Sequence, residues 1–100
     1  MNIYICSPLR GDYPTNISNA KKYCREVILQ GDMPICPHIY FTQFLNDSIP
    51  REREIGLKCG LELVKLCDMI YVYGEPSEGM KAEITLAKQM GIEVVCHKLI

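Results

Sequence analysis

DMIYVYGEPSEGMKAE, residues 68–83, is the stretch from which the fold of this chain can be worked out. Apolar and aromatic side chains fill 69–73, a turn follows over 74–76, and Ser77 is a suitable first residue for a helix. If that helix continues at about 100° per residue, Glu83 falls near the middle of its apolar face. The stretch therefore predicts a buried strand, a turn and a helix with a carboxylate on its inner side.

The carboxylate of Glu83 has two explanations, which periodicity alone does not separate. It either lies at the edge of the helix, exposed or paired with a basic side chain, or it faces a cavity. In a cavity, burial raises the pKa of the carboxyl group and makes it a candidate catalytic group. The position favours a cavity, because a helix that follows a strand begins at the ligand-binding edge of an open α/β sheet.

The size and composition of the chain are those of one ordinary domain covering residues 1–100. Hydrophobic residues make up 48% of the chain, which is enough for a core. The formal net charge is −1, so the chain has no excess of positive charge that would attract nucleic acid or an acidic membrane surface. No apolar run approaches the ~20 residues that a membrane helix needs, and the N-terminus does not resemble a secretory signal. We expect neither a nucleic-acid partner nor a membrane partner.

Cysteine usage indicates free thiols and a reducing compartment. The cysteines fall inside predicted strands and helices, where a thiol packs as a small hydrophobe, and no CxxC pair is present. Cys36 and His38 are separated by one residue, but no second pair at zinc-like spacing supports a metal site. We therefore expect no metal, no disulfides and a cytoplasmic location. The six cysteines are Cys6, Cys24, Cys36, Cys59, Cys67 and Cys96.

Strands and helices are expected to alternate along the whole chain. Strands are predicted over 2–6, 33–37, 69–73 and 92–96, and helices from Thr15 or Asn16 to Gly31, from 51 to 67 and from 77 to 91. This alternation indicates an α/β fold, a three-layer α/β/α sandwich of the flavodoxin or Rossmann kind, with a small parallel sheet of about four strands. Right-handed crossovers favour the strand order 2-1-3-4. Gly56 and Gly60 are expected to permit close helix packing, including packing against another subunit.

Two loops at the carboxyl edge of this sheet carry groups suited to an anion. Residues 7–12 include Arg10, whose guanidinium can form a two-pronged contact, and Gly11, which lets the backbone approach a ligand. A plain turn with a solvated arginine is the alternative. In the expected strand order, this loop faces residues 74–79 across one crevice, with Glu83 beside it.

Other polar side chains expected at this edge also have two explanations. His38 either donates to a phosphate or sugar hydroxyl or makes a structural hydrogen bond. Glu52 and Arg53, in the first turn of the second long helix, either belong to the site or are solvated charges at a helix N-terminus.

The ordered set of motifs resembles the nucleoside 2-deoxyribosyltransferase-like superfamily, in particular its small bacterial and phage members and the related 2′-deoxynucleoside 5′-monophosphate N-glycosidases. The run YICSPLRG, residues 4–11, resembles the first strand and the phosphate or sugar loop of that family. Ser77-x-Gly79-x-x-x-Glu83 resembles its nucleophile motif. The resemblance covers essentially the whole chain.

This resemblance implies a role for each matched residue. Glu83 would attack the anomeric carbon of a 2-deoxyribosyl group and form a covalent glycosyl-enzyme, and Tyr4 would orient it. The implied partner is a small nucleoside or nucleotide, the implied assembly is a homodimer or a higher homo-oligomer, and no cofactor is expected. The residues expected to bind substrate or its phosphate are Ser7, Arg10, Gly11, His38, Ser77 and Gly79.

One departure from the family pattern leaves the function open. The family's enzymes use an aspartate to protonate the leaving base, and the matching position here falls near Cys59 and Gly60, where no carboxylate lies. Asp47, Glu52 or Glu54 are candidate replacements. The chain is then either an N-glycosidase or transferase, or a nucleotide-binding module without turnover, since a general acid contributes roughly 10²–10⁴-fold. A third reading is a scaffold with an incidental crevice.

Overall fold

A computed structural model describes residues 1–97, and within them the sheet has four parallel strands in the order β2-β1-β3-β4. This confirms the predicted α/β fold and strand order. Three strands lie within one residue of their predicted positions, but the predicted strand 33–37 is too long. The strands are β1 (Asn2–Cys6), β2 (Met33–Ile35), β3 (Met69–Tyr73) and β4 (Glu93–His97).

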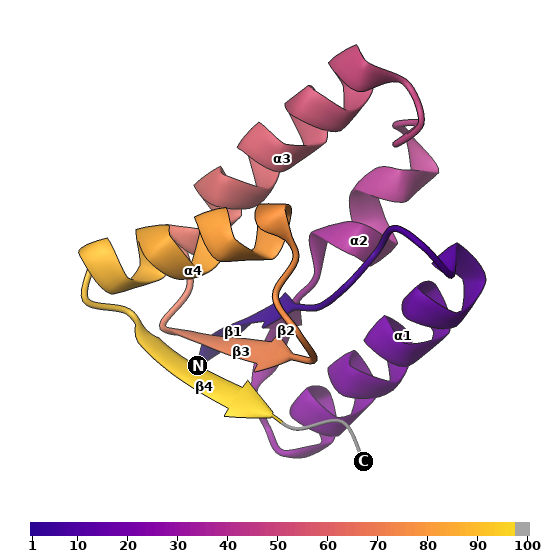
Figure 1. Cartoon of the computed structure of the whole chain (residues 1–100). Helices are drawn as coiled ribbons and strands as arrows, with labels where there is room; N and C mark the ends of the chain where they lie inside the picture. Colours follow the sequence, from indigo (N-terminus) through magenta and orange to yellow (C-terminus); the bar gives the residue numbers. More distant parts are fainter. Residues whose placement is uncertain (98–100) are drawn as a thin grey trace.

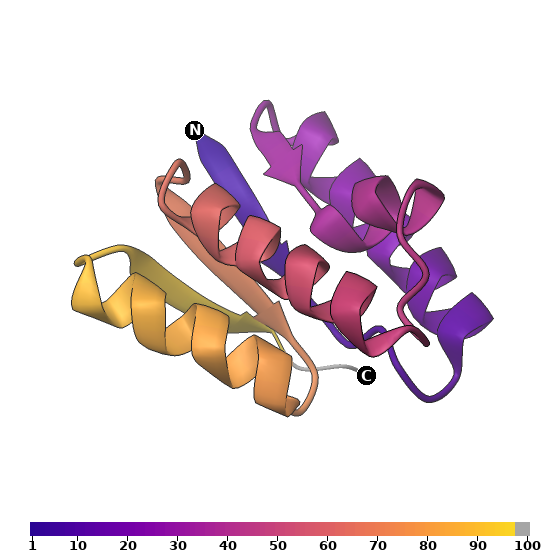
Figure 2. The same cartoon turned by 90° about the horizontal axis from the view of Figure 1, so that it is seen from above.

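Helices cover both faces of the sheet (Figure 1). The helix α1 (Tyr13–Leu29) covers one face, while α3 (Pro50–Val64) and α4 (Glu78–Gln89) lie side by side over the other (Figure 2). The short helix α2 (Pro37–Tyr40) continues into a 3₁₀ turn, η1 (Phe41–Gln43), and lies between α1 and α3. The three-layer arrangement expected from the alternation is therefore present. In the part of the chain that the structure describes, no helix could cross a membrane.

Alternate residues of β1 enter two separate cores, because successive side chains of a strand point to opposite faces. Ile3 and Ile5 pack with Val27 on the α1 side. Tyr4 and Cys6 pack with residues of α3 and α4 on the other side. A parallel sheet buried on both faces is expected to show such continuous apolar strands. The second core includes Val64, Cys67, Ile70, Val72, Met80 and Ala87.

The ends of several elements differ from those predicted, for local reasons. Pro37 ends β2 early because it occupies the first turn of α2, where a proline has no amide hydrogen to lose. Helix α1 begins earlier than Thr15, because the side chain of Asp12 caps it by accepting a hydrogen bond from the Thr15 backbone N–H at 3.4 Å. All six cysteines are free thiols, as predicted.

The pairing of β1 with β3 brings two loops together at the carboxyl edge of the sheet. Cys6 lies opposite Val72, so the chain leaves both strands at the same level. After β3, Gly74 turns the chain with a φ of 78°, which favours glycine. Ser77 then caps α4, its hydroxyl accepting a hydrogen bond from the Met80 backbone N–H at 3.4 Å. This cap directs the first turns of α4 towards the loop after β1.

Candidate active site

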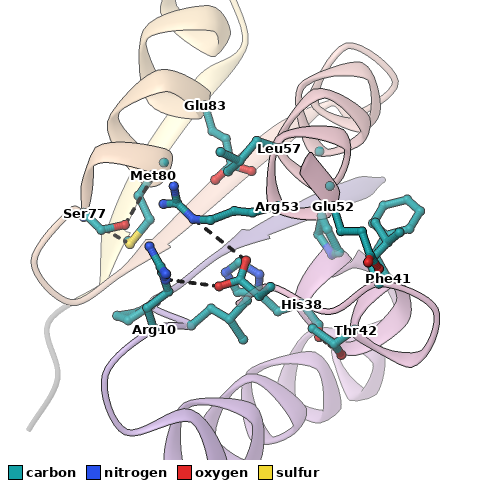
Figure 3. A pocket seen from close by; sticks show the side chains of 18 residues that line it. Arg10, His38, Phe41, Thr42, Glu52, Arg53, Leu57, Ser77, Met80 and Glu83 are labelled. Atoms are coloured by element: carbon teal, nitrogen blue, oxygen red, sulfur yellow. Dashed lines mark hydrogen bonds and ion pairs between the residues drawn. The ribbon is translucent and has the colours of Figure 1, made fainter. Parts of the chain in front are cut away.

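A pocket opens at this edge of the sheet, between α2, α3, α4 and the loop after β1 (Figure 3). Its deep end is formed by Glu83, and its mouth by charged side chains from the loops and from α3. The polar residues that the argument below uses are Arg10, His38, Asp47, Arg53, Ser77 and Glu83.

Glu83 projects from α4 into the deep end of the pocket, and only 8% of its surface is exposed. The Tyr4 hydroxyl donates a hydrogen bond to Oε2, and the Cys6 thiol donates to Oε1 at 3.5 Å. Both donors come from the same face of β1, two residues apart. The ion pairs of residues 1–97 do not include Glu83. The cavity explanation is therefore confirmed, and the exposed or ion-paired explanation is wrong.

Burial gives Glu83 unusual acid–base properties. Loss of solvation raises its pKa from 4.5 to about 7, although the hydrogen bonds from Tyr4 and Cys6 act in the opposite direction. Burial, reinforced by the neighbouring Glu83 carboxylate, also raises the pKa of the Tyr4 hydroxyl and of the Cys6 thiol. Both groups therefore remain protonated donors at neutral pH. The site holds a carboxylate that titrates near neutrality between two uncharged donors.

Gly60 lets α3 approach this carboxylate closely. A Cβ atom at position 60 would lie 3.2 Å from Glu83 Oε2 and 3.2 Å from the Tyr4 hydroxyl oxygen. The sequence predicts a glycine that permits close packing, and the structure identifies the neighbours as Tyr4 and Glu83 of the same chain. No side chain from position 60 can therefore enter the deep end without displacing one of them.

The mouth of the pocket is organised around Asp47. Arg10 Nε lies 3.1 Å from one of its carboxylate oxygens, and Arg53 Nε lies 3.9 Å from the other. Arg10 comes from the loop after β1 and Arg53 from α3, and both side chains are labelled in Figure 3. Asp47 thus links two segments that are far apart in the sequence. Of the two explanations for Arg53, the structure favours membership of the site.

His38 lies in the pocket wall and also ties α2 to the end of β1. Its Nε2 donates a hydrogen bond to the Ser7 carbonyl oxygen at 2.6 Å, which assigns the ring proton to Nε2 because a carbonyl can only accept. Burial lowers the pKa of His38, although the Ser7 carbonyl and Asp47 oppose this effect. The ring is therefore neutral near pH 7, with Nδ1 as an acceptor.

The pocket contains most, but not all, of the residues that the sequence singles out. Ser77 and Gly79 line it, while Tyr4 lies behind Glu83. The Ser7 side chain is 1% exposed and outside the lining, and its hydroxyl has no hydrogen-bond partner within residues 1–97. Gly11 lies in a second, more open hollow beyond the Arg10–Asp47 pair.

The candidate general acids are all engaged in other contacts. Glu52 lines the pocket, but it accepts a hydrogen bond from the Asn46 backbone N–H at 3.0 Å. Glu54 lies outside the pocket and forms a surface ion pair with Lys58 at 3.3 Å. Asp47 is held by Arg10 and Arg53 as described above. Residues 1–97 contain no group of three side chains suited to hold a metal ion.

Some residues of the site do not appear among those predicted. Cys6 could have been found, because it lies two residues after Tyr4 and must share its strand face. The apolar wall formed by Phe41 and Leu45 carries no such signal, since it belongs to a segment that the sequence presents as an irregular loop.

Comparison with known proteins identifies both a family and a set of similar folds. The structure resembles that of a 2-deoxyribosyltransferase from Bacillus psychrosaccharolyticus, with a TM-score of 0.71 and 19% identity, over 98% of this chain and 72% of that one. It also resembles a 2-deoxyribosyltransferase from Leishmania mexicana, with a TM-score of 0.69 and 16% identity, over 97% of this chain and 63% of that one. At these identities the likeness establishes the fold. Curated protein sequences give no match.

The family comparison covers nearly the whole chain. A model described as "Domain of unknown function (DUF7768)" matches residues 1–97. The chain therefore belongs to the DUF7768 domain family.

Proposed function

We propose that this protein cleaves or transfers at the N-glycosidic bond of a 2′-deoxynucleoside or its 5′-monophosphate, with Glu83 as the nucleophile. The observation that carries the proposal is the buried Glu83 carboxylate at the deep end of a pocket, oriented by Tyr4. The similar folds of two 2-deoxyribosyltransferases support a nucleoside as the kind of substrate.

In this mechanism, one carboxylate oxygen of Glu83 attacks the anomeric carbon of the sugar. The bond from that carbon to the base nitrogen breaks, its electron pair leaves with the base, and the base takes up a proton from water. The developing oxocarbenium ion is stabilised by the carboxylate, as in retaining glycosidases. Tyr4 and Cys6 keep the carboxylate in position. Water or a second base then attacks the same carbon and releases Glu83.

The opposite end of the pocket is suited to the 5′-phosphate. Ser77 lies at the N-terminus of α4, where unpaired backbone N–H groups and the helix dipole favour an anion. Arg10 provides a guanidinium at the mouth. Gly79 lies close to Leu57: a Cβ atom at position 79 would be 3.2 Å from Leu57 Cδ2. A larger residue at position 79 would therefore narrow the pocket.

The second candidate function is nucleotide binding without turnover. It is favoured by the contacts of Asp47 and Glu52, which leave no evident carboxylic acid in the pocket to protonate a departing base. Such a module would use Arg10, Ser77 and the apolar wall to hold a nucleotide, with Glu83 contacting the sugar.

A chromatographic assay for free base separates the two candidates. The four deoxynucleosides and their 5′-monophosphates are incubated with the protein, with and without an acceptor base. The enzyme proposal expects base release that Glu83→Gln reduces by at least about 10³-fold, because the nucleophile is removed. Glu78→Gln, on the exposed side of the same helix, is the matched control and retains activity. Nucleotide binding measured by calorimetry without any base release would favour the binding module.

We also propose a homo-oligomer. Large apolar side chains are exposed next to the pocket on α2, after η1, just before α3 and on α3, namely Tyr40, Phe44, Ile49 and Ile55. Sedimentation of the wild type and of Phe44→Ser tests this proposal. A monomeric wild type would contradict it.

A further inference from the structure

Among residues 1–97, no positively charged group contacts Glu83. Within residues 1–97, its hydrogen-bond donors are the Tyr4 hydroxyl and the Cys6 thiol, and the backbone of Gly60 closes the third side. The two arginines of the pocket pair with Asp47 at the mouth, through their Nε atoms, and not with Glu83. A buried carboxylate without a counter-ion is energetically costly, and a cationic ligand beside it would relieve that cost.

Within residues 1–97, the acidic groups around the pocket that could protonate a leaving base are already engaged in other contacts. The Tyr4 and Cys6 protons are donated to Glu83, and the Nε2 proton of His38 is donated to the Ser7 carbonyl. Asp47 lies between two guanidinium groups, and Glu52 accepts a backbone hydrogen bond. Together with Arg10 and Arg53, these are the titratable and charged groups that face the pocket from β1, α2, α3 and the two loops.

We propose that the substrate is an N-glycoside whose glycosidic nitrogen already carries a positive charge, as in a pyridinium mononucleotide. The proposal rests on the Glu83 chemistry proposed above and extends the substrate beyond 2′-deoxynucleotides, because nicotinamide mononucleotide is a riboside. It follows from two independent observations within residues 1–97, the missing counter-ion of Glu83 and the engagement of Tyr4, Cys6, His38, Asp47 and Glu52 in other contacts.

The chemistry of such a substrate balances without a general acid. A Glu83 oxygen forms a bond to the anomeric carbon while the carbon–nitrogen bond breaks. The electron pair of that bond returns to the ring nitrogen, which changes from a cation to a neutral pyridine. Water then attacks the anomeric carbon, Glu83 leaves as a carboxylate, and the proton of the water passes to solvent.

The remaining groups of the pocket fit the other parts of this molecule. Ser77 at the N-terminus of α4 and Arg10 are suited to a 5′-phosphate. Phe41, Leu45 and Leu57 provide an apolar wall for a flat ring. A single compound that combines the phosphate with a cationic ring is nicotinamide mononucleotide, which is therefore the probe of choice.

The test compares this probe with an analogue whose ring nitrogen is uncharged. The wild-type protein is incubated with nicotinamide mononucleotide, with its reduced dihydro form, and with the four deoxynucleoside 5′-monophosphates, and the released bases are quantified chromatographically against protein-free blanks. The dihydro compound has nearly the same shape, but its ring nitrogen is neutral and needs a proton in order to leave. We expect nicotinamide release to exceed release from the other five compounds by at least about 100-fold, the lower range of a general acid's contribution.

Two variants make the outcome specific to the site. Glu83→Gln should abolish nicotinamide release, and the surface variant Glu78→Gln should retain it, since Glu78 lies on the exposed side of α4 and pairs there with Lys81. Faster release from the deoxynucleotides than from nicotinamide mononucleotide, lost in Glu83→Gln, would overturn this inference and leave the proposed function intact. Nicotinamide release that persists in Glu83→Gln would overturn both. Absence of any release would overturn the inference and favour the binding module.

Discussion

The two ends of the pocket each hold a carboxylate, and the two carboxylates have opposite surroundings. At the deep end, Glu83 is buried between uncharged donors, and burial raises its pKa to about 7. At the mouth, Asp47 is partly exposed and held by Arg10 and Arg53. The carboxylate at the deep end is thus a candidate nucleophile, while the carboxylate at the mouth is an ion-pair partner. The difference comes from solvation and neighbouring charge and not from residue type.

The largest expected effect concerns the pH dependence of stability. Because the pKa of Glu83 is raised from 4.5 to about 7 in the folded state, the folded protein retains this proton where the unfolded chain has lost it. The contribution of Glu83 to stability is therefore largest below about pH 4.5, falls as pH rises, and is smaller by about 3 kcal/mol above about pH 7. Glu83→Gln removes this dependence.

Urea denaturation at a series of pH values measures this effect. Between about pH 4 and about pH 8, the titration of Glu83 should lower the unfolding free energy of the wild type by about 3 kcal/mol. Glu83→Gln should lack this loss. The exposed Glu78→Gln should follow the wild type. Parallel pH profiles for Glu83→Gln and wild type would show that Glu83 titrates normally.

The next largest effect is expected for Tyr4→Phe, which removes the hydroxyl that donates to Glu83. Loss of this hydrogen bond raises the pKa of Glu83 further, because the bond favours the ionised form. A hydrogen bond to a charged group contributes about 1.5–3 kcal/mol, so kcat/KM at neutral pH should fall roughly tenfold to 100-fold. The acid limb of the pH–rate profile should move to higher pH. Tyr71→Phe, on the opposite face of the sheet, is the control and should leave the limb in place.

A smaller effect of the same kind is expected at Cys6. A thiol is a weak donor, so Cys6→Ala should reduce kcat/KM by less than about tenfold, again with the acid limb moved to higher pH. Cys6→Ser retains a donor and should lie closer to the wild type. A loss of activity in Cys6→Ala without any movement of the limb would assign Cys6 to packing alone.

The smallest effect is expected for Asp47→Asn at the mouth. This ion-pair network is partly exposed, so the cost in stability should be below about 1 kcal/mol. Release of Arg10 and Arg53 should instead strengthen binding of a deoxynucleoside 5′-monophosphate by up to about fivefold, while binding of the uncharged deoxynucleoside stays the same. Calorimetry with both ligands measures this. Equal gains for the two ligands would contradict an electrostatic role for Asp47.

These two ends of the pocket also differ in how far the sequence predicts them. Glu83 lies on a regular helix, where the period of 3.6 fixes the face of each side chain, whereas the role of Tyr4 rests on the family resemblance. The strand–turn–helix run from Met69 to Glu83 is accordingly predicted almost residue by residue. The sequence predicts Ser77 as the first residue of the helix, and in the structure Ser77 is its cap, with α4 beginning at Glu78.

The mouth could not be derived in this way, because it depends on contacts between loops. Asp47 is predicted only as a possible acid, and its position between Arg10 and Arg53 follows from the path of an irregular segment. Ser7 lies next to the loop in sequence, yet the strand pleat turns its side chain away from the pocket lining. Gly60 is predicted to allow close packing, but which atoms approach it depends on how α3 crosses β1 and α4.

The most direct test of the account is to trap the sugar on Glu83. A 2-fluoro-substituted nucleoside 5′-monophosphate is incubated with the protein, the mixture is quenched in acid, and the digested protein is mapped by mass spectrometry. The account predicts a glycosyl mass increment on the peptide that contains Glu83, located at that residue, and no increment in Glu83→Gln. An increment at another residue, or none while the wild type still releases base, would contradict the central claim that Glu83 is the nucleophile.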